Sequence, residues 1–330
     1  MQGKVSSENS ASTEVTVGID TCKEWLDVHV LPANTELRVS NTKKGHKQLL
    51  AALKGLDVRV IVIEATGKHH RSVHRFLHET GYVIAVVNPL RSRLFAEALG
   101  QLAKTDKVDA RMLAMLGAMT RPKATPPLPA NLENLREVVR ARDAVIADKV
   151  ALENRLGATE QHVVRTEITR LIAFSRRAID RLEAEALRLI KADAGFARRL
   201  VVLTSIPGVG DITAIGLIAN MPELGSLDAK AAGMLAGLAP IACDSGQSKG
   251  QRHTRCGRKT VRTGIYMAAL SAATWNPALK RFHDRLVAAG KRPKVALTAV
   301  MRKLLVLANS LLKDDRCWSQ QSPIAKSSST

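Results

Sequence analysis

The stretch VRVIVIE, residues 58–64, decides the fold of the first part of the chain, together with VTVGID, residues 15–20. The first stretch is almost entirely apolar and β-branched, which is typical of a strand buried on both faces of a sheet. In the second stretch apolar residues alternate with others, which also indicates a strand. The strands end in Glu64 and Asp20, and an idle charge is unexpected at the end of a buried strand. Adjacent strands would bring these two carboxylates together at one edge of the sheet.

Further strands and helices are predicted around these two stretches. Periodicity and turn residues place strands at Trp25–Leu31, Leu37–Ser40 and Tyr82–Val87, and helices at Lys44–Leu56, His69–Glu79 and from Asn88 through Arg121. The order β-β-β-α-β-α-β-α predicts an α/β domain over residues 14–121, a mixed sheet with helices packed on it. Residues 1–13 are polar and expected to be disordered. His70, His74 and His78 lie at helical spacing and are expected at the surface.

The rest of the chain is predicted to be mainly helical. Residues 122–129 are rich in proline, which blocks regular structure and indicates a linker. From Asn131 to about Ala194 apolar residues recur at helical spacing, which predicts two long helices in an antiparallel or dimerising coiled coil, with a break near residues 157–160. We therefore predict a linker and coiled coil at 122–195, a mainly helical C-terminal domain at 196–315, and a flexible tail at 316–330.

The charge balance indicates a nucleic-acid partner. The 330 residues include 50 Lys and Arg against 30 Asp and Glu, a formal net charge of +20, which is typical of phosphate-backbone binding. Sixteen of these basic residues lie between Gly246 and Arg316, where three Asp oppose them. Aromatic residues make up only 3%, which disfavours binding by base stacking. The four cysteines form no Cys-x-x-Cys pair, and no stretch approaches a membrane span or a signal peptide, so we expect a cytoplasmic, nucleoid-associated protein without a membrane partner.

Four carboxylates form a candidate metal site. Asp106 and Asp109 are three residues apart, so on a helix both lie on the same face, where they can join Asp20 and Glu64. Four converging carboxylates repel one another unless cations bind them, and hard oxygen ligands favour Mg²⁺, or Mn²⁺ in its place. Two such ions would activate a nucleophile and stabilise the leaving oxygen at a phosphodiester. The alternative is a pair of strand-end caps and a solvated helix face, with Lys104 and Arg111 as ion-pair partners.

Two polar segments of the C-terminal half are candidates for phosphate binding. The turn IPGVG, residues 206–210, is similar to a helix-hairpin-helix turn, although a plain turn between helices fits it equally well. Beyond it, Ser245 and Ser248 lie beside glycines and are followed by arginines, so one of them could be a nucleophile; the residues alone favour an ordinary basic loop. The candidate nucleic-acid-binding residues are Pro207, Gly208, Gly210, Lys249, Arg252, Arg255, Arg258, Lys259 and Arg262.

Several short motifs, spread over nearly the whole chain, carry a family resemblance. They are GIDTCK at 18–23, IEATG at 63–67, KTDKVDAR at 104–111, IPGVG at 206–210, AGLAP at 236–240, SG at 245–246 and MRKL at 301–304. In these motifs and their order the chain resembles the DEDD transposases of insertion sequences, which are bridge-RNA-guided recombinases related to Piv-type DNA invertases.

The resemblance implies an architecture and a mechanism. It implies a RuvC-like domain of RNase H-like fold, a coiled-coil linker and a C-terminal transposase domain. It also implies that Asp20, Glu64, Asp106 and Asp109 bind Mg²⁺, and that Ser245 forms a covalent link to DNA. In that family the acidic site and the serine come from different protomers of an oligomer, here a dimer or tetramer. A non-coding bridge RNA pairs with the donor and target DNA.

We therefore predict a transposase or site-specific recombinase that cuts and rejoins duplex DNA, with an Asp/Glu tetrad that binds Mg²⁺ and a serine nucleophile. One alternative is a metal-only RuvC-like nuclease or resolvase, in which water attacks and Ser245 is dispensable. The other is a nucleic-acid-binding protein without enzymatic activity, which would tolerate loss of all four carboxylates.

Overall fold

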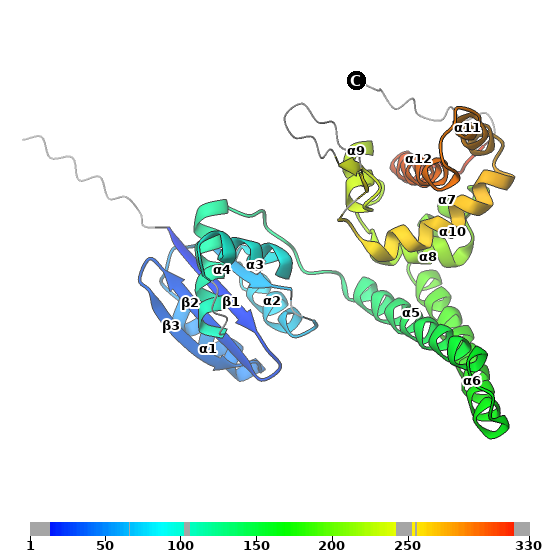
Figure 1. The fold of residues 1–330 in the computed structure, drawn as a ribbon. Coiled ribbons are helices and arrows are strands. Elements are labelled where there is room, and N and C mark those ends of the chain that lie inside the picture. Colours follow the sequence, from blue (N-terminus) through cyan, green and yellow to red (C-terminus); the bar gives the residue numbers. More distant parts are fainter. Residues whose placement is uncertain (1–13, 66, 102–105, 242–252, 255, 320–330) are drawn as a thin grey trace, which may run out of the picture. The chain divides into compact units, whose positions relative to one another are not determined.

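A computed structural model describes residues 14–65, 67–101, 106–241, 253–254 and 256–319; at Asp106 and Lys107 it describes the backbone alone. The chain divides into two compact units, residues 1–128 and 129–330 (Figure 1). The segment 1–13 and the end of the tail from residue 320, for which the sequence predicts disorder and flexibility, lie outside the described residues.

The first unit is built on a five-stranded sheet with the strand order β3-β2-β1-β4-β5. The strands are β1 (Val15–Thr21), β2 (Trp25–Leu31), β3 (Thr35–Ser40), β4 (Val58–Glu64) and β5 (Ile84–Val87). β1, β2 and β3 pair antiparallel, whereas β4 runs parallel to both β1 and β5. The predicted mixed sheet and the predicted order of its elements are confirmed.

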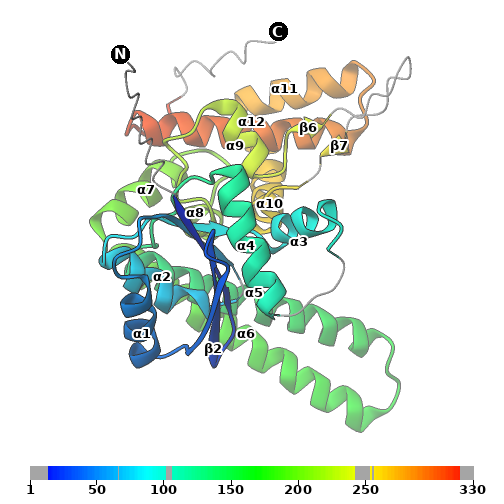
Figure 2. The ribbon, with the colours of Figure 1, turned by 90° about the vertical axis from the view of Figure 1, so that its left-hand side faces the viewer.

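Helices cover both faces of this sheet, and Figure 2 shows α1 and α2 on one side with α3 and α4 on the other. Their bounds are α1 (Lys43–Leu53), α2 (His70–Glu79), α3 (Pro89–Ala98) and α4 (Asp106–Thr120). Successive residues of a strand point to opposite faces. In β4, Ile61 and Ile63 accordingly join the core under α1 and α2, whereas Val60 and Val62 join the core under α4. The same alternation places Asp20 and Glu64 on the α4 side.

The proline-rich segment is fastened to the first unit. The backbone N–H of Thr125 donates to the Ile84 carbonyl at 2.7 Å, and the Thr125 hydroxyl accepts from the Val86 N–H at 3.2 Å. Thr125 is also bound to α2, because the His74 Nε2 and the Thr125 carbonyl oxygen are 2.7 Å apart. His74 is buried, so the prediction of a surface position is wrong for this histidine, because the side chain binds a segment that lies far away in sequence.

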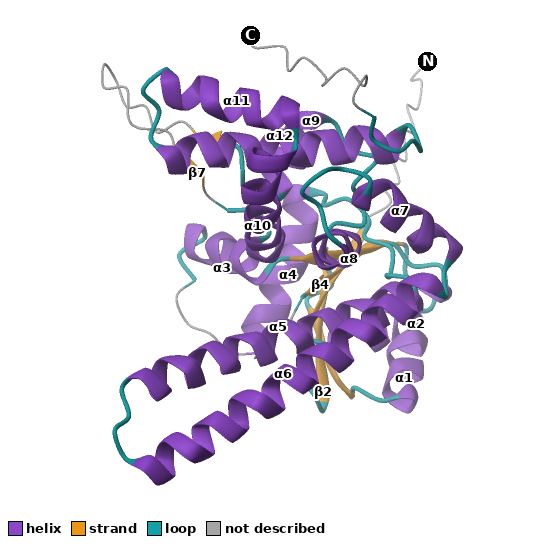
Figure 3. Cartoon of the chain, turned by 90° about the vertical axis from the view of Figure 1, so that its right-hand side faces the viewer, coloured by secondary structure: helices purple, strands orange, loops and turns teal. Residues whose placement is uncertain are grey.

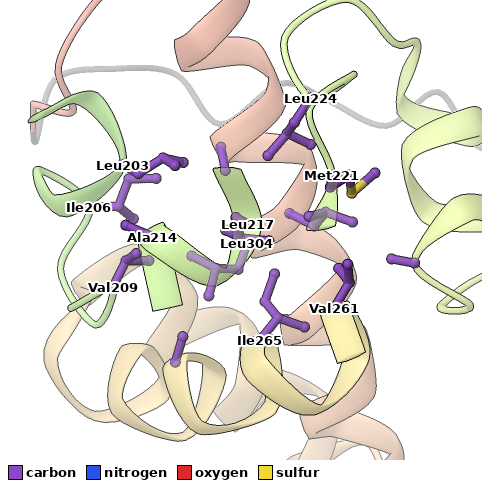
Figure 4. Packing of buried hydrophobic residues seen from close by; sticks show 14 of the residues in the cluster. Leu203, Ile206, Val209, Ala214, Leu217, Met221, Leu224, Val261, Ile265 and Leu304 are labelled. Carbon is purple, nitrogen blue, oxygen red and sulfur yellow. The ribbon is translucent and has the colours of Figure 1, made fainter. Parts of the chain in front are cut away.

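In the part of the second unit that the structure describes, one short two-stranded ladder accompanies the helices (Figure 3). Its elements are α5 (Ala130–Gly157), α6 (His162–Lys191), α7 (Ala194–Thr204), α8 (Asp211–Asn220), α9 (Ala229–Leu235), β6 (Pro240–Ile241), β7 (His253–Thr254), α10 (Lys259–Trp275), α11 (Pro277–Ala288) and α12 (Pro293–Lys313). The two long helices α5 and α6 form a hairpin whose connection falls where the sequence predicts a break. At its base, Leu135 and Ile190 pack into the core of the unit shown in Figure 4.

Within the described part of the chain, α12 has the length and hydropathy of a membrane-crossing helix. The expectation that no stretch approaches a membrane span is therefore wrong by this measure. Over half of the apolar stretch of α12 is buried, and Val300, Leu304 and Ala308 lie in the core of the second unit. Burial of this kind is typical of the core helix of a folded domain.

Candidate catalytic site

Asp20 and Glu64 end two neighbouring parallel strands. β1 and β4 pair with Ile19 opposite Ile63, so the carboxylates that follow these residues share one edge of the sheet. Both side chains are half-buried. The prediction that adjacent strands bring these two residues to the same edge is confirmed.

Helix α4 lies unusually close to β1 because two glycines leave room for it. A Cβ atom at Gly18 would lie 2.0 Å from the Ala110 carbonyl oxygen and 2.4 Å from the Ala114 nitrogen, and one at Gly117 would lie 2.6 Å from Cγ2 of Thr16. Gly117 thus faces the start of β1 while Ala110 faces its middle, so the helix runs antiparallel to the strand. Its first turn, which holds Asp106 and Asp109, therefore approaches the end of the strand at Asp20.

Glu64 and Asp109 line a common pocket of about 380 Å³. Helix α3 forms another wall; Asn88 caps its start by accepting a hydrogen bond from the Leu90 N–H at 2.8 Å. Ser92 of this helix is buried, and its hydroxyl donates to Oε2 of Glu64. Ser92 is not predicted from the sequence, because neither periodicity nor a motif distinguishes it from other helical serines.

Arg93 and Glu97 lie on the same wall of the pocket. The Arg93 Nε donates to Oε1 of Glu97 at 2.9 Å, one helical turn away. These two residues were also missed, because an ion pair at this spacing is common on exposed helix faces.

The donor chemistry of the site fits a hard divalent cation. Carboxylate oxygens are the ligands that Mg²⁺ and Mn²⁺ prefer; Glu64 and Asp109 line one pocket, and Asp20 ends the strand next to that of Glu64. Among the side chains that the structure describes, no three His, Cys, Asp or Glu are grouped closely enough to hold an ion. The side chain of Asp106 lies outside that description, as does Lys104; Arg111 is exposed on α4.

The segment that contains Ser245 begins and ends at a two-stranded ladder. Pro240 pairs with Thr254 and Ile241 with His253, so the described residues on either side of 242–252 lie side by side. Ser245, Ser248, Lys249 and Arg252 belong to this segment and, like Arg255, lie outside the described residues.

Two of the predicted phosphate-binding arginines bind groups within the second unit. Arg258 pairs with both carboxylate oxygens of Glu223 at 2.7 and 2.8 Å and donates to the Asn220 carbonyl at 2.8 Å. Burial alone would raise the pKa of Glu223, but the hydrogen bonds and charge of Arg258 more than offset this, and the pKa lies below its usual value. Arg262 donates to the Cys256 carbonyl at 2.9 Å. Lys259, by contrast, is exposed at the start of α10.

The turn at residues 206–210 joins α7 to α8. Gly208 has a φ of +102°, and a Cβ there would lie 2.5 Å from the Ala272 nitrogen of α10. Packing against α10 therefore requires glycine at this position, independently of any ligand. Pro207 is half-buried beside it, and Gly210 is exposed as the N-cap residue of α8. Gly210 is thus the predicted turn residue whose backbone faces solvent at a helix N-terminus.

The two halves of the chain match two family models. Residues 17–163 match the model of DEDD transposases of the IS110 type, described as Transposase, and residues 201–284 match the model described as Transposase IS116/IS110/IS902 family. The chain belongs to the IS110 family of DEDD transposases. As a member of this family it is an enzyme that cleaves and rejoins DNA. The first matched range contains all four candidate carboxylates, and the second contains Ser245.

Individual proteins are also similar to the chain, two of them over nearly its full length. The pilin gene-inverting proteins of Moraxella bovis and Moraxella lacunata are each 27% identical to the chain over 315 residues, which cover 92% of this chain and 98% of each relative. An uncharacterized 43.6 kDa protein of insertion element IS110 from Streptomyces coelicolor is 31% identical over 124 residues, 37% of this chain and 31% of that protein.

Proposed function

We propose that this IS110-family transposase is a recombinase with a composite active site, in which Asp20, Glu64, Asp106 and Asp109 hold Mg²⁺ and Ser245 is the nucleophile. The observation that carries the proposal is that Glu64 and Asp109, from β4 and α4, line one pocket beside the end of β1. We assign the first unit to the RuvC-like group of RNase H-like folds. Its mixed sheet, with a carboxylate at the ends of two adjacent parallel strands, supports this assignment.

The chain's own residues would prepare the site for the cation. Gly18 lets α4 come close to β1 at Ala110 and Ala114, and Ser92 orients the Glu64 carboxylate by a hydrogen bond. Bound Mg²⁺, or Mn²⁺ in its place, would offset the charge that develops on the phosphate oxygens.

The serine step conserves the phosphodiester energy. The Ser245 hydroxyl oxygen attacks the scissile phosphorus and loses its proton to a nearby carboxylate or water. A P–O bond to serine forms while the P–O bond to one deoxyribose breaks, and the released deoxyribose oxygen takes up a proton. Attack by the hydroxyl of the new DNA strand reverses these changes and frees the serine, so the exchange requires no external energy source. Ser248 is the neighbouring competitor for this role.

We further propose duplex donor and target DNA as substrates, with a non-coding bridge RNA as guide. The net charge of +20 supports binding to phosphate backbones. Lys249, Arg252, Arg255 and Lys259 are our candidates for phosphate contacts, together with the Gly210 backbone; Arg258 and Arg262 instead bind Glu223 and the Cys256 carbonyl. The acidic site lies in the first unit and the serine in the second, and we propose that they meet between protomers of a cytoplasmic dimer or tetramer.

The decisive experiment compares Ser245→Ala and Asp109→Asn with the wild-type protein in a strand-exchange assay that also detects covalent protein–DNA adducts. We expect wild type to form an adduct on denaturing gels, and both variants to lose adduct and exchange together. A Ser248→Ala variant should retain both. Full strand exchange by Ser245→Ala would support water as the attacking group, as in a metal-only nuclease, and would contradict the serine mechanism.

A further inference from the structure

We propose that Arg93 of α3 binds the scissile phosphate in the pocket lined by Glu64 and Asp109. Among the described residues that line this pocket, Arg93 is the one basic side chain. The inference rests on the proposed function, because it takes this pocket to be the place where the phosphodiester reacts.

The backbone beside Arg93 is held in a fixed relation to the carboxylates. The preceding residue, Ser92, is buried and hydrogen-bonded to Glu64, and α3 starts at the capping residue Asn88 followed by Pro89. The base of the Arg93 side chain is therefore tied to the same carboxylate that is proposed to hold the cation. Such a connection aligns a charged group with the reacting atoms before substrate arrives.

The guanidinium group of Arg93 has donors to spare. Its Nε donates a hydrogen bond to Glu97 at 2.9 Å. Among the described residues, Glu97 is the partner that this guanidinium group binds. Both terminal nitrogens thus remain for two parallel hydrogen bonds to a phosphate, the geometry for which arginine is suited. The side chain is 75% exposed, so an incoming backbone can reach it.

Strand cleavage is favoured by a positively charged hydrogen-bond donor at this place, in addition to the metal. When a nucleophile attacks a phosphodiester, negative charge builds up on the two non-bridging oxygens. The carboxylates cannot donate to those oxygens, and an arginine beside them can. Because the donor is present before the charge develops, it lowers the barrier rather than only tightening binding.

The test compares Arg93→Ala with Arg91→Ala in the full-length protein. Arg91 is also exposed on α3 but does not line the pocket, which makes it a matched control. With saturating duplex DNA carrying the element's junction, we expect Arg93→Ala to cleave on the order of 100-fold more slowly than wild type. Arg91→Ala should cleave the DNA and bind it like wild type, with binding measured in metal-free buffer.

A second substrate tests the electrostatic role directly. Replacing the scissile phosphate by a neutral methylphosphonate removes the charge that Arg93 is proposed to bind, so wild type and Arg93→Ala should then react at similar rates. Equal cleavage by Arg93→Ala and Arg91→Ala, or an unchanged rate difference on the methylphosphonate, would overturn the inference. Asp109→Asn distinguishes failure of the proposed function from failure of the role of Arg93. If Asp109→Asn is inactive while Arg93→Ala is fully active, only the role of Arg93 is wrong. Wild-type cleavage by Asp109→Asn overturns both.

Discussion

Ser92 and Glu64 are 28 positions apart in the sequence, and their side chains meet through a hydrogen bond at the pocket. A hydroxyl that donates to a metal-binding carboxylate fixes the direction of its oxygens. Loss of such a partner typically weakens metal binding by about 10- to 100-fold. We therefore expect Ser92→Ala to reduce Mn²⁺ affinity by this order, measured by calorimetric titration of the protein without DNA.

Two further variants separate orientation from general damage. Ser92→Thr keeps the hydroxyl and should bind Mn²⁺ more tightly than Ser92→Ala. Ser72, which is exposed on α2, serves as the control, and Ser72→Ala should match wild type. If Ser92→Ala also binds Mn²⁺ like wild type, the hydrogen bond has no part in orienting Glu64.

At this scale the sequence predicts some site residues and not others for a physical reason. Asp20 and Glu64 interrupt apolar strands, so a local pattern reveals them. Ser92 contacts Glu64 across space, which no local pattern records, and Arg93 forms an ion pair at a spacing that is common on exposed helix faces. The partner of Arg258 is equally hidden, since a basic residue looks the same in sequence whether it binds a phosphate or, as here, a carboxylate.

At the scale of elements, the pair Arg258–Glu223 joins the loop after α8 to the start of α10, just beyond β7. The pKa of Glu223 is lower in the folded chain than in the unfolded one. Its ionised form therefore stabilises the fold at any pH above its unfolded value of about 4.3. This contribution is lost as the pH falls through the lowered folded value, where the carboxylate becomes protonated.

Thermal unfolding as a function of pH measures this contribution. We expect Glu223→Gln to unfold at a lower temperature than wild type at pH 7. The difference should shrink as the pH falls below about 4, because wild type then loses the charge as well. A difference that stays constant down to pH 3 would mean that the variant acts through packing and not through the ion pair.

Periodicity predicts most elements of both units, because burial on one face imposes it directly. What periodicity does not contain is how closely elements approach. The contact of α4 with β1 depends on Gly18 and Gly117, and that of the turn before α8 with α10 depends on Gly208. In the sequence, Gly208 resembles part of a phosphate-binding turn, because a glycine that makes room for a helix and one that makes room for a phosphate are the same residue.

For the whole molecule, the net charge of +20 predicts DNA binding that weakens steeply with salt. Each lost phosphate contact should reduce the slope of log affinity against log salt by about one. We expect Lys259→Ala to show this reduction in a fluorescence-anisotropy titration.

Arg258→Ala is the informative comparison for this measurement. Its guanidinium already binds Glu223, so the variant should lose thermal stability and keep the wild-type salt slope. An equal reduction of the slope in both variants would instead assign Arg258 to the phosphate backbone.

The division into two units was only partly predictable from composition. The proline content of residues 122–129 indicates a boundary, and the contacts divide the chain at residue 128. Apolar periodicity predicts that α5 and α6 form a separate coiled coil, yet the base of these helices shares a core with α7 and α8. Apolar spacing reveals that a helix has a buried face, whereas the identity of the covering element depends on the packing of the whole chain.

The hydrogen bonds that hold the proline-rich segment on the first unit leave little of it free to act as a linker. Thr125 is bound to β5, and the Leu128 carbonyl accepts a hydrogen bond from Arg75 at 3.4 Å. Helix α5 begins at Ala130, so Pro129 is the single residue left between the two fastened parts. The segment that looks like a free linker in the sequence is therefore part of the first unit as far as Leu128.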